Sequence, residues 1–269
     1  MSTDVLLPFA AWLGLREAAD AAARDTALVD AVHERLPAGG PLAIHDLGTG
    51  TGSLLRWLAP RLPGPQHWVL YDRDPELLAR AAAGAVTSAD GLPVTVVTRC
   101  TDLTRLTPAD LAGADLVTAS ALLDMLTAEE VDRVVAACAG RPTLFMISVT
   151  GRVRLTPGDP LDAEVAAAFN DHQRRTVDGR RLLGPDAVDA AAAAFAAHGV
   201  PVRAGRSPWR LGPEQAELAA EWFRGWLGAA CEQRPDLADR TAGYARRRLA
   251  EAAAGRLRVL VDHRDLLAG

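Results

Sequence analysis

The chain has 269 residues, 49% of them hydrophobic, and its 34 acidic residues outnumber its 29 basic residues to give a formal charge of −5. This length accommodates one well-filled domain, and the mild acidity gives no electrostatic reason to expect nucleic acid, since phosphate contacts need clustered positive charge. Every strongly basic residue is arginine, which excludes a mechanism that uses a lysine Schiff base.

The three cysteines, Cys100, Cys138 and Cys231, lie far apart and form no CxxC pair. We therefore expect neither a metal site nor a disulfide framework, and a reducing compartment fits best. The N-terminus lacks the basic region of a signal peptide, and no segment is long and apolar enough to span a bilayer. A cytoplasmic protein without a membrane partner is the simplest interpretation.

The first elements in chain order lead into a glycine loop. Residues 9–36 have apolar side chains at helical spacing and are expected to form a helix in two pieces, ended by the Pro and Gly residues of 37–41. A short strand is expected at 42–46. It runs through Gly-Thr-Gly-Thr-Gly into a helix at 53–62.

Further short apolar strands alternate with helices. They are expected at 68–71, 94–97, 114–119 and 143–149. Asp74 caps the helix after the second strand, with Pro75 at its first position, and Thr127 to Glu130 has capping-box spacing. This alternation predicts a doubly wound α/β fold with a mostly parallel seven-stranded sheet and helices on both faces.

Beyond residue 149 the pattern changes. Residues 151–185 are polar and are expected to be an insertion. The elements expected after it are a helix at 185–198, a strand at 200–204, helices at 213–231 and 237–254, and a last strand at 256–263. With no separating linker, we expect a single domain over 1–269, divided into an N-terminal helical segment (1–40), a cofactor-binding half (41–150) and a substrate-side half (151–269).

The glycine loop is the most informative motif. Strand, glycine loop and helix in this order let the backbone approach a ligand closely, although a tight turn without a ligand is an alternative and NAD binding is the usual rival. Asp46 lies two residues before Gly48, where a carboxylate suits an ammonium and a sulfonium better than a pyrophosphate. The third glycine of the dinucleotide pattern is replaced by Ser53.

Asp46 to Gly52 resembles motif I of the class I, seven-stranded S-adenosylmethionine-dependent methyltransferases, and the similarity continues in order over residues 40–150. The resemblance implies S-adenosylmethionine as cofactor. The residues that it assigns to the cofactor are Asp46, Gly48, Thr49, Gly50, Asp72, Arg73, Asp102, Leu103 and Ser120. Asp72 would hold both ribose hydroxyls, Asp102 the adenine amino group, and Ser120 the methionine end. Asp72 would equally serve an NAD ribose, and Asp102 could instead be a loop acid or a cap.

Two residues are candidates for catalysis. His172 lies in the polar insertion, where it could act as a base or orient the substrate; a solvated histidine on a helix surface is the alternative. Asp124 follows the loop after the fourth strand, and it could instead be an acid at the start of the next helix.

Arg16, Asp20 and Arg24 share one face of the first helix at a spacing of four. Arg24 is a candidate cofactor contact, because helices before motif I often cover the cofactor in enzymes of this kind. A surface row of ion pairs is the alternative.

Together these features predict methyl transfer from S-adenosylmethionine to an oxygen or nitrogen of a small-molecule acceptor by in-line displacement, with no metal and no nucleic-acid partner. Two alternatives stay open: a catalytically silent, methyltransferase-like binding protein, and an NAD-linked oxidoreductase. Asp46 and Ser53 count against the oxidoreductase.

Overall fold

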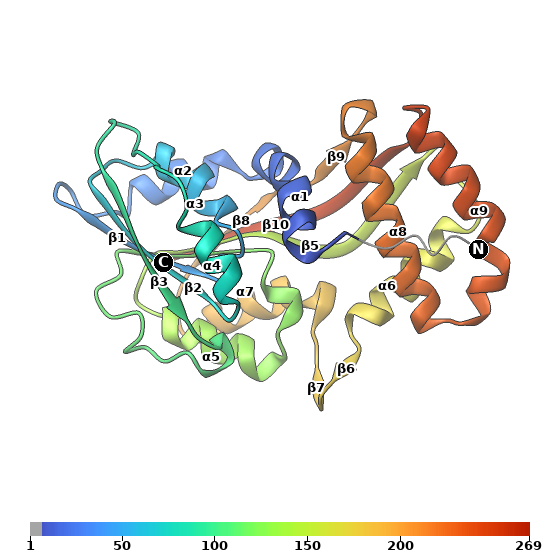
Figure 1. The fold of residues 1–269 in the computed structure, drawn as a ribbon. Coiled ribbons are helices and arrows are strands. Elements are labelled where there is room, and N and C mark those ends of the chain that lie inside the picture. Colours follow the sequence, from blue (N-terminus) through green and yellow to red (C-terminus); the bar gives the residue numbers. More distant parts are fainter. Residues whose placement is uncertain (1–6) are drawn as a thin grey trace.

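A large mixed sheet forms the centre of the computed structural model, which describes residues 7–269 (Figure 1). Its strands are β1 (Leu42–Leu47), β2 (Gln66–Asp72), β3 (Val94–Cys100), β4 (Leu116–Ser120), β5 (Thr143–Thr156), β8 (Val202–Arg206), β9 (Trp209–Leu211) and β10 (Arg258–Ala268). The order is β3-β2-β1-β4-β5-β10-β8, with β9 paired to β10. Strands β1 to β5 pair in parallel, and β10 is antiparallel to its neighbours. The predicted doubly wound, mostly parallel sheet is confirmed.

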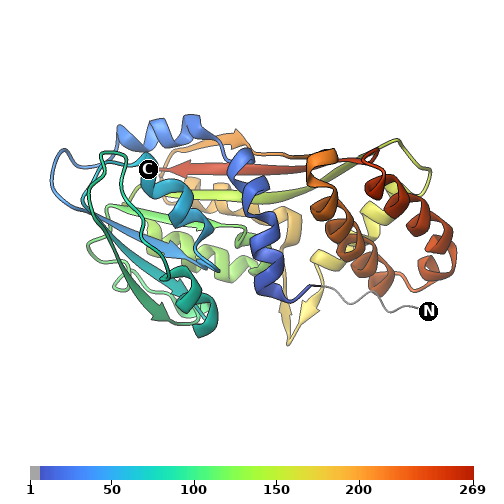
Figure 2. The ribbon, with the colours of Figure 1, turned by 45° about the horizontal axis from the view of Figure 1, so that its top comes forward.

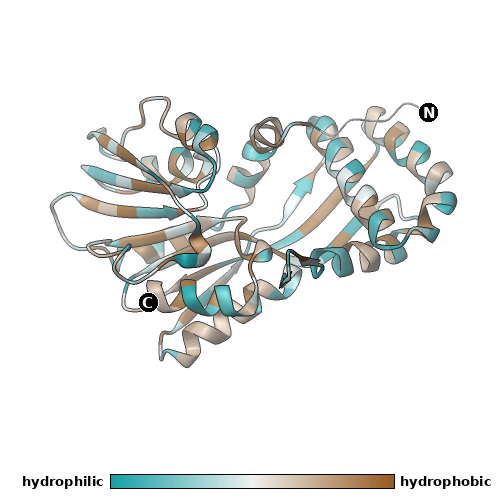
Figure 3. Cartoon of the chain, turned by 60° about the horizontal axis from the view of Figure 1, so that its bottom comes forward, coloured by the Kyte–Doolittle hydropathy of each residue, from teal (hydrophilic) through white to brown (hydrophobic). Residues whose placement is uncertain are grey.

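Helices cover both faces of this sheet. The helices are α1 (Phe9–Ala23), α2 (Thr26–His33), α3 (Ser53–Leu58), α4 (Pro75–Ala81), α5 (Ala128–Cys138), α6 (Asp162–Gln173), α7 (Ala187–Ala197), α8 (Ala216–Gln233) and α9 (Asp236–Ala253). Buried side chains of α5 and α7 pack in one core, and those of α2, α3 and α4 pack in a second core with the other strand residues. In Figure 3, brown apolar segments recur along the strands, and the helices carry both pale brown and teal segments.

Short 3-10 turns and one hairpin complete the described chain. They are η1 (Ala59–Arg61), η2 (Leu103–Arg105), η3 (Leu123–Met125), η4 (Gly184–Asp186), η5 (Pro213–Gln215) and the hairpin β6 (Thr176–Val177) and β7 (Arg180–Arg181). The expected caps are present. Asp74 accepts the Glu76 amide at 2.8 Å, and Thr127 and Glu130 form the reciprocal capping box.

Strand β5 is longer than expected. We predicted that it ends at residue 149 and that a polar insertion begins at 151, but β5 continues to Thr156, where it pairs with Arg258 of β10. The exposed Arg152 and Arg154 made this end of β5 look like part of the polar insertion, although Val153 and Leu155 between them pack toward the core. The long β5–β10 ribbon leads away from the sheet to the helices α6, α8 and α9 (Figure 2).

A buried arginine fastens α9 to α6 in this helical part. Arg248 is 2% exposed, and its guanidinium donates two hydrogen bonds of 2.7 Å to the carboxylate of Asp162. It also donates to the carbonyl of Pro157 at 2.6 Å and to Glu251 at 2.9 Å. Tyr244 donates to the same Asp162 carboxylate at 2.7 Å. Asp162 is therefore the main partner of a charge that has almost no contact with water.

We expect Asp162→Ala to lower the free energy of unfolding by about 3 kcal/mol, because it leaves the buried Arg248 charge poorly compensated. Urea unfolding at pH 7 measures this change. Glu164→Gln is the matched control on the same helix, since Glu164 pairs only with the partly exposed Arg234 and Arg240. Its expected cost is below about 1 kcal/mol. Equal costs for the two variants would contradict the assigned role of Asp162.

Candidate functional site

The glycine loop lies between β1 and α3 at the carboxyl edge of the sheet, and its backbone needs glycine. Gly48, Gly50 and Gly52 have φ angles of +65°, +55° and +84°, a region that L side chains rarely adopt. There is also little space for a side chain at two of these glycines. A Cβ on Gly48 would lie 2.9 Å from Cδ1 of Leu122, and one on Gly52 would lie 3.0 Å from Cα of Ala81. The three glycines are thus required by both conformation and packing.

Asp72 ends β2 beside this loop. One carboxylate oxygen accepts the amide of Gly50 at 2.9 Å, and the other accepts the amide of Asp74 at 3.1 Å. Asp72 therefore holds the loop in shape as well as lying next to it. Each oxygen keeps a free lone pair, since a carboxylate can accept about four hydrogen bonds.

Asp46 is buried at the end of β1. It is 1% exposed, and its Oδ1 accepts a hydrogen bond of 2.7 Å from the hydroxyl of Thr118 on β4. Burial raises the pKa of Asp46 to about 6, against the opposing effects of the Thr49 and Thr118 hydroxyls and the nearby charge of Arg24. A carboxyl group in this state is costly to ionise without a cationic ligand.

Arg24 follows the last residue of α1 and reaches into the same region. It is 4% exposed, and its Nη2 donates to the hydroxyls of Ser53 at 3.1 Å and Ser120 at 3.3 Å. Its guanidinium also lies 5.2 Å from the ring centre of Trp57. The alternative of a surface ion-pair row is wrong for this residue. Arg16 and Asp20 do pair, at 3.0 Å, but Asp20 is also buried.

Buried polar atoms without a partner gather around the loop. Among the described residues, Nε of Arg24 is buried and makes no hydrogen bond. Oδ2 of Asp46 and Oγ1 of Thr49 are also buried without a hydrogen bond of normal geometry, although the Thr49 hydroxyl lies close enough to Asp46 to lower its pKa. Buried polar groups nearly always find partners in folded proteins, so a group of unsatisfied atoms of both charges marks a place for a polar ligand. A ligand with both an ammonium and a carboxylate fits this set.

Asp102, Leu103 and Arg73 lie at the edge of this region. Asp102 caps η2 by accepting the amide of Thr104 at 3.0 Å and its hydroxyl at 2.8 Å, and these hydrogen bonds lower its pKa. Asp102 is therefore a cap, as the alternative prediction proposed. Leu103 packs in the core, and Arg73 is exposed on the loop after β2.

The two catalytic candidates come from different elements but share a neighbour. Asp124 lies in η3 directly after β4, and burial raises its pKa while the charges of Arg16 and Arg175 lower it. His172 on α6 contacts Glu232 of α8 through Nε2 at 3.1 Å and Arg175 through Nδ1 at 3.3 Å. Burial and the Arg175 charge lower the pKa of His172, so its ring is neutral at pH 7. His172 is half-buried, not a solvated surface residue.

Arg16 belongs to a cluster that local sequence patterns did not reveal. Trp209 of β9 donates to Asp20 at 2.9 Å, and the Arg16 guanidinium lies 5.0 Å from the Trp209 ring centre. The ring of His263 on β10 lies 5.3 Å away from the same tryptophan, and burial lowers the pKa of His263 to about 4. In the sequence, only the spacing of Arg16 and Asp20 indicated this cluster, because Trp209 and His263 come from the other end of the chain.

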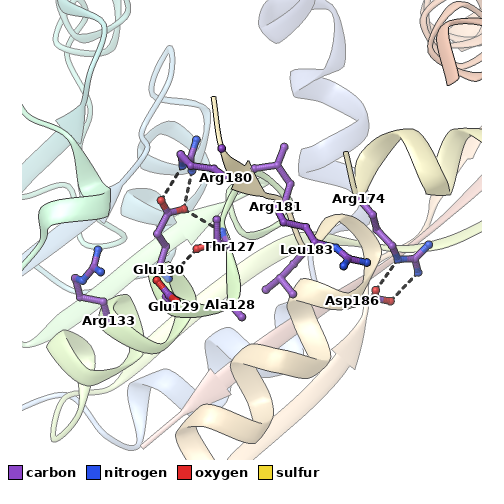
Figure 4. A pocket seen from close by; sticks show the side chains of 12 residues that line it. Thr127, Ala128, Glu129, Glu130, Arg133, Arg174, Arg180, Arg181, Leu183 and Asp186 are labelled. Atoms are coloured by element: carbon purple, nitrogen blue, oxygen red, sulfur yellow. Dashed lines mark hydrogen bonds and ion pairs between the residues drawn. The ribbon is translucent and has the colours of Figure 1, made fainter. Parts of the chain in front are cut away.

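Cavity volume does not locate the site. A groove of about 570 Å³ lies between the N-terminus of α5 and the hairpin β6–β7, where Arg180 pairs with Glu130 and Arg174 pairs with Asp186 (Figure 4). A second groove, of about 410 Å³, is lined by α1 and by the β8–β9 region. Residues of the glycine loop line neither groove. The loop is covered by Leu13 and Leu122, and Leu13 Cδ1 would lie 3.2 Å from a Cβ on Gly50.

The comparison with protein families agrees with this geometry. Residues 44–141 match the model of a family described as a methyltransferase domain. This segment is a methyltransferase domain. No curated protein matches the chain significantly.

Solved structures similar to the methyltransferase share its fold at low identity. A cyclopropane-fatty-acyl-phospholipid synthase-like protein from Lactobacillus casei is 16% identical with a TM-score of 0.53, over 98% of this chain and 96% of that one. The cyclopropane synthase MmaA2 from Mycobacterium tuberculosis is 13% identical with a TM-score of 0.45, over 91% and 84% of the two chains. At 16% identity, the similarity to the Lactobacillus casei protein shows the fold alone.

We expect Asp46→Asn to stabilise the cofactor-free methyltransferase at pH 7.5, by at most about 3 kcal/mol. The pKa of Asp46 is raised to about 6, so its stabilising contribution is present at low pH and is lost as pH rises through 6. The gain from the variant should therefore grow between pH 5 and pH 8 in urea unfolding.

Asp115→Asn is the matched control for this experiment. Asp115 precedes the neighbouring strand β4, is half-buried and accepts the amide of Ala43 at 2.8 Å, a bond that asparagine can keep. We expect no pH-dependent gain for this variant. If Asp46→Asn were less stable than the wild type at pH 7.5, the burial cost assigned to Asp46 would be refuted.

Proposed function

We propose that the methyltransferase transfers a methyl group to an oxygen or nitrogen atom of a small-molecule acceptor by in-line displacement. The observation that carries this proposal is Asp124, a carboxyl group with a raised pKa directly after β4. An O–H or N–H acceptor must lose a proton when it is methylated, and a carboxylate with a raised pKa is suited to take it.

The cofactor site is proposed from the groups around the glycine loop. Asp72 would hold the ribose hydroxyls and Asp102 the adenine amino group, with Arg73 and Leu103 next to them. At the methionine end, the unsatisfied Oδ2 of Asp46 suits the ammonium and the unsatisfied Nε of Arg24 suits the carboxylate. Gly48, Thr49, Gly50 and Ser120 complete this end of the site.

When bound, S-adenosylmethionine supplies a methyl group on a positively charged sulfur. An acceptor lone pair would take the methyl group while the electrons of the carbon–sulfur bond return to sulfur, and Asp124 would take the acceptor proton. Because the methyl group is already activated, the protein contributes mainly by holding the reactants in line, which can supply about 7–11 kcal/mol.

The charges near Asp124 favour an acceptor with an acidic or carbonyl group. Arg16 and Arg175 both act on Asp124, one from α1 and the other from the end of α6. His172 contacts the Arg175 guanidinium at 3.3 Å and is proposed to orient it, while Glu232 holds the opposite side of the His172 ring. A neutral His172 can accept this hydrogen bond without repelling the arginine.

We also propose that the chain functions as one domain and acts on small molecules, not on nucleic acid. Two of the arginines in the groove beside the hairpin β6–β7 are neutralised, since Arg174 and Arg180 each form an ion pair with an acid. Within residues 7–269, the helices lack the combination of length and apolar character that a membrane crossing requires.

We expect Asp72→Ala to weaken the binding of S-adenosylhomocysteine by about 10- to 100-fold, because hydrogen bonds between the carboxylate and the ribose are lost. Titration calorimetry measures the affinity, and circular dichroism checks the fold. Asp74→Asn is the control two residues away, since asparagine caps the helix α4 as well as aspartate does. If Asp72→Ala bound S-adenosylhomocysteine with unchanged affinity, the proposed contact between Asp72 and the ribose would be wrong.

We expect Asp124→Asn to lower kcat by about 10²- to 10³-fold with unchanged cofactor affinity, as for the loss of a general base. His172→Ala should instead mainly raise KM for the acceptor. The release of S-adenosylhomocysteine is measured with an acceptor found in a screen of hydroxyl- and amine-containing metabolites. The acid limb of the pH dependence of kcat/KM should give an apparent pKa above the usual range of an aspartate. This limb should be absent in Asp124→Asn. Full activity of Asp124→Asn would exclude it as the base.

A further inference from the structure

Asp265 of β10 is a fully buried carboxylate that binds three separate segments of the chain. It is 0% exposed. Its Oδ1 accepts the amide of Ile147 at 2.7 Å and the hydroxyl of Ser207 at 2.5 Å, and its Oδ2 accepts the amide of Asp25 at 2.8 Å. In the part of the chain that the structure describes, no arginine or histidine pairs with it within 4.0 Å. A buried charge held only by neutral donors calls for an explanation.

The first contact holds a strained bulge in β5. Leu266 lies opposite Phe145 and Arg264 lies opposite Ser148, so Asp265 alone faces the two residues between them. One of these two is Ile147, a β-branched residue with a φ angle of +55°. Such a conformation persists only where the surroundings enforce it. The hydrogen bond from the Ile147 amide to Asp265 enforces it here.

The bulge sets the position of the residues after β4. The carbonyl of Met146, the other bulge residue, accepts the amide of Ala121 at 2.9 Å, and Ala121 itself has a φ angle of +53°. Ser120 precedes Ala121, and its hydroxyl accepts a hydrogen bond of 3.3 Å from Arg24. Through the bulge and Ala121, Asp265 thus helps to fix the position of Ser120, one member of the Arg24–Ser120 pair.

The other carboxylate oxygen holds the opposite side of the same pair. Oδ2 binds the amide of Asp25, the residue directly after Arg24, where the chain turns from α1 into α2. Strand β8 packs closely here, since a Cβ on Gly205 would lie 1.9 Å from Oδ2 of Asp25. The backbone of Arg24 is therefore fixed from the C-terminal strand, although the two residues are far apart in sequence.

We propose that Asp265 is a positioning residue that fixes Arg24 and Ser120 in the geometry that binds the amino-acid end of the cofactor. This inference rests on the role proposed for Arg24 in the function above. Burial raises the pKa of Asp265 and lowers the pKa of Arg24, and the charge of each group opposes this shift in the other. A neutral side chain could fill the same space but would not provide this charge.

Asp265→Asn tests the proposal, because asparagine keeps the shape and removes the charge and one acceptor. Calorimetry with two ligands separates positioning from general damage. S-adenosylhomocysteine carries the amino-acid end, and 5′-methylthioadenosine lacks it. We expect Asp265→Asn to weaken S-adenosylhomocysteine about tenfold and to leave the affinity for 5′-methylthioadenosine within about twofold of the wild type, which a purely structural role would not do.

Asp262→Asn is the matched control on the same strand. Asp262 is nearly buried but pairs at 2.8 Å with the exposed Arg206, away from Arg24, and this variant should bind both ligands normally. If Asp265→Asn fails to fold, Ser207→Ala removes one hydrogen bond from the same carboxylate. It should weaken only S-adenosylhomocysteine, by about threefold, which corresponds to the loss of part of one hydrogen bond.

The outcomes are distinct. Equal weakening of both ligands, or no weakening of either, overturns the role of Asp265. Arg24→Met separates this failure from a failure of the proposed function. If Arg24→Met loses S-adenosylhomocysteine while Asp265→Asn keeps it, the cofactor site stands and only the inference about Asp265 fails. If Arg24→Met binds S-adenosylhomocysteine normally, the proposed role of Arg24 is itself wrong and the inference falls with it.

Discussion

Two opposite charges buried at one edge of the sheet constrain everything around them. Arg24 and Asp46 are nearly inaccessible to water, yet they are not paired within 4.0 Å and each keeps an unsatisfied polar atom. Burial shifts the pKa of each toward its neutral form, downward for Arg24 and upward for Asp46. A direct ion pair would relieve both groups but would also remove the binding capacity of both. The separation is therefore what suits this place to a ligand that carries both charges itself.

The sequence predicted best what is determined locally. The glycine loop, the cap at Asp74 and the capping box at Thr127 depend on neighbouring residues, and each was placed correctly. The proximity of Asp46 and Asp72 followed from topology, because adjacent parallel strands end at the same edge of a sheet. The full length of β5 was missed. Its last residues alternate between the exposed Arg152 and Arg154 and the apolar Val153 and Leu155, a strand pattern that the polar composition of residues 151–185 masked.

The rest of the site depends on contacts between distant segments. Arg24 could be read as a surface residue because helical spacing shows which residues share a face but not what covers it. Ser53 and Ser120, which accept its hydrogen bonds, lie on two other elements. The partner of His172 is Glu232 on α8, and no local pattern joins them. Asp265 gave no signal, since it lies beyond residue 263, where the last strand was expected to end, whereas β10 continues to Ala268 and its three buried donors come from distant segments.

The β5–β10 ribbon explains how the two ends of the site are kept in register. At its sheet end, Asp265 and the bulge at Ile147 hold the residues that surround Arg24. Farther along, the carbonyl of Gly151 on β5 accepts a hydrogen bond of 2.9 Å from Asn170 of α6, the helix that carries His172 and precedes Arg175. The cofactor side and the proposed acceptor side are thus attached to one pair of strands. The short segment from Ser120 to Asp124 joins these two sides. That segment contains the strained Ala121, which the β5 bulge holds in place.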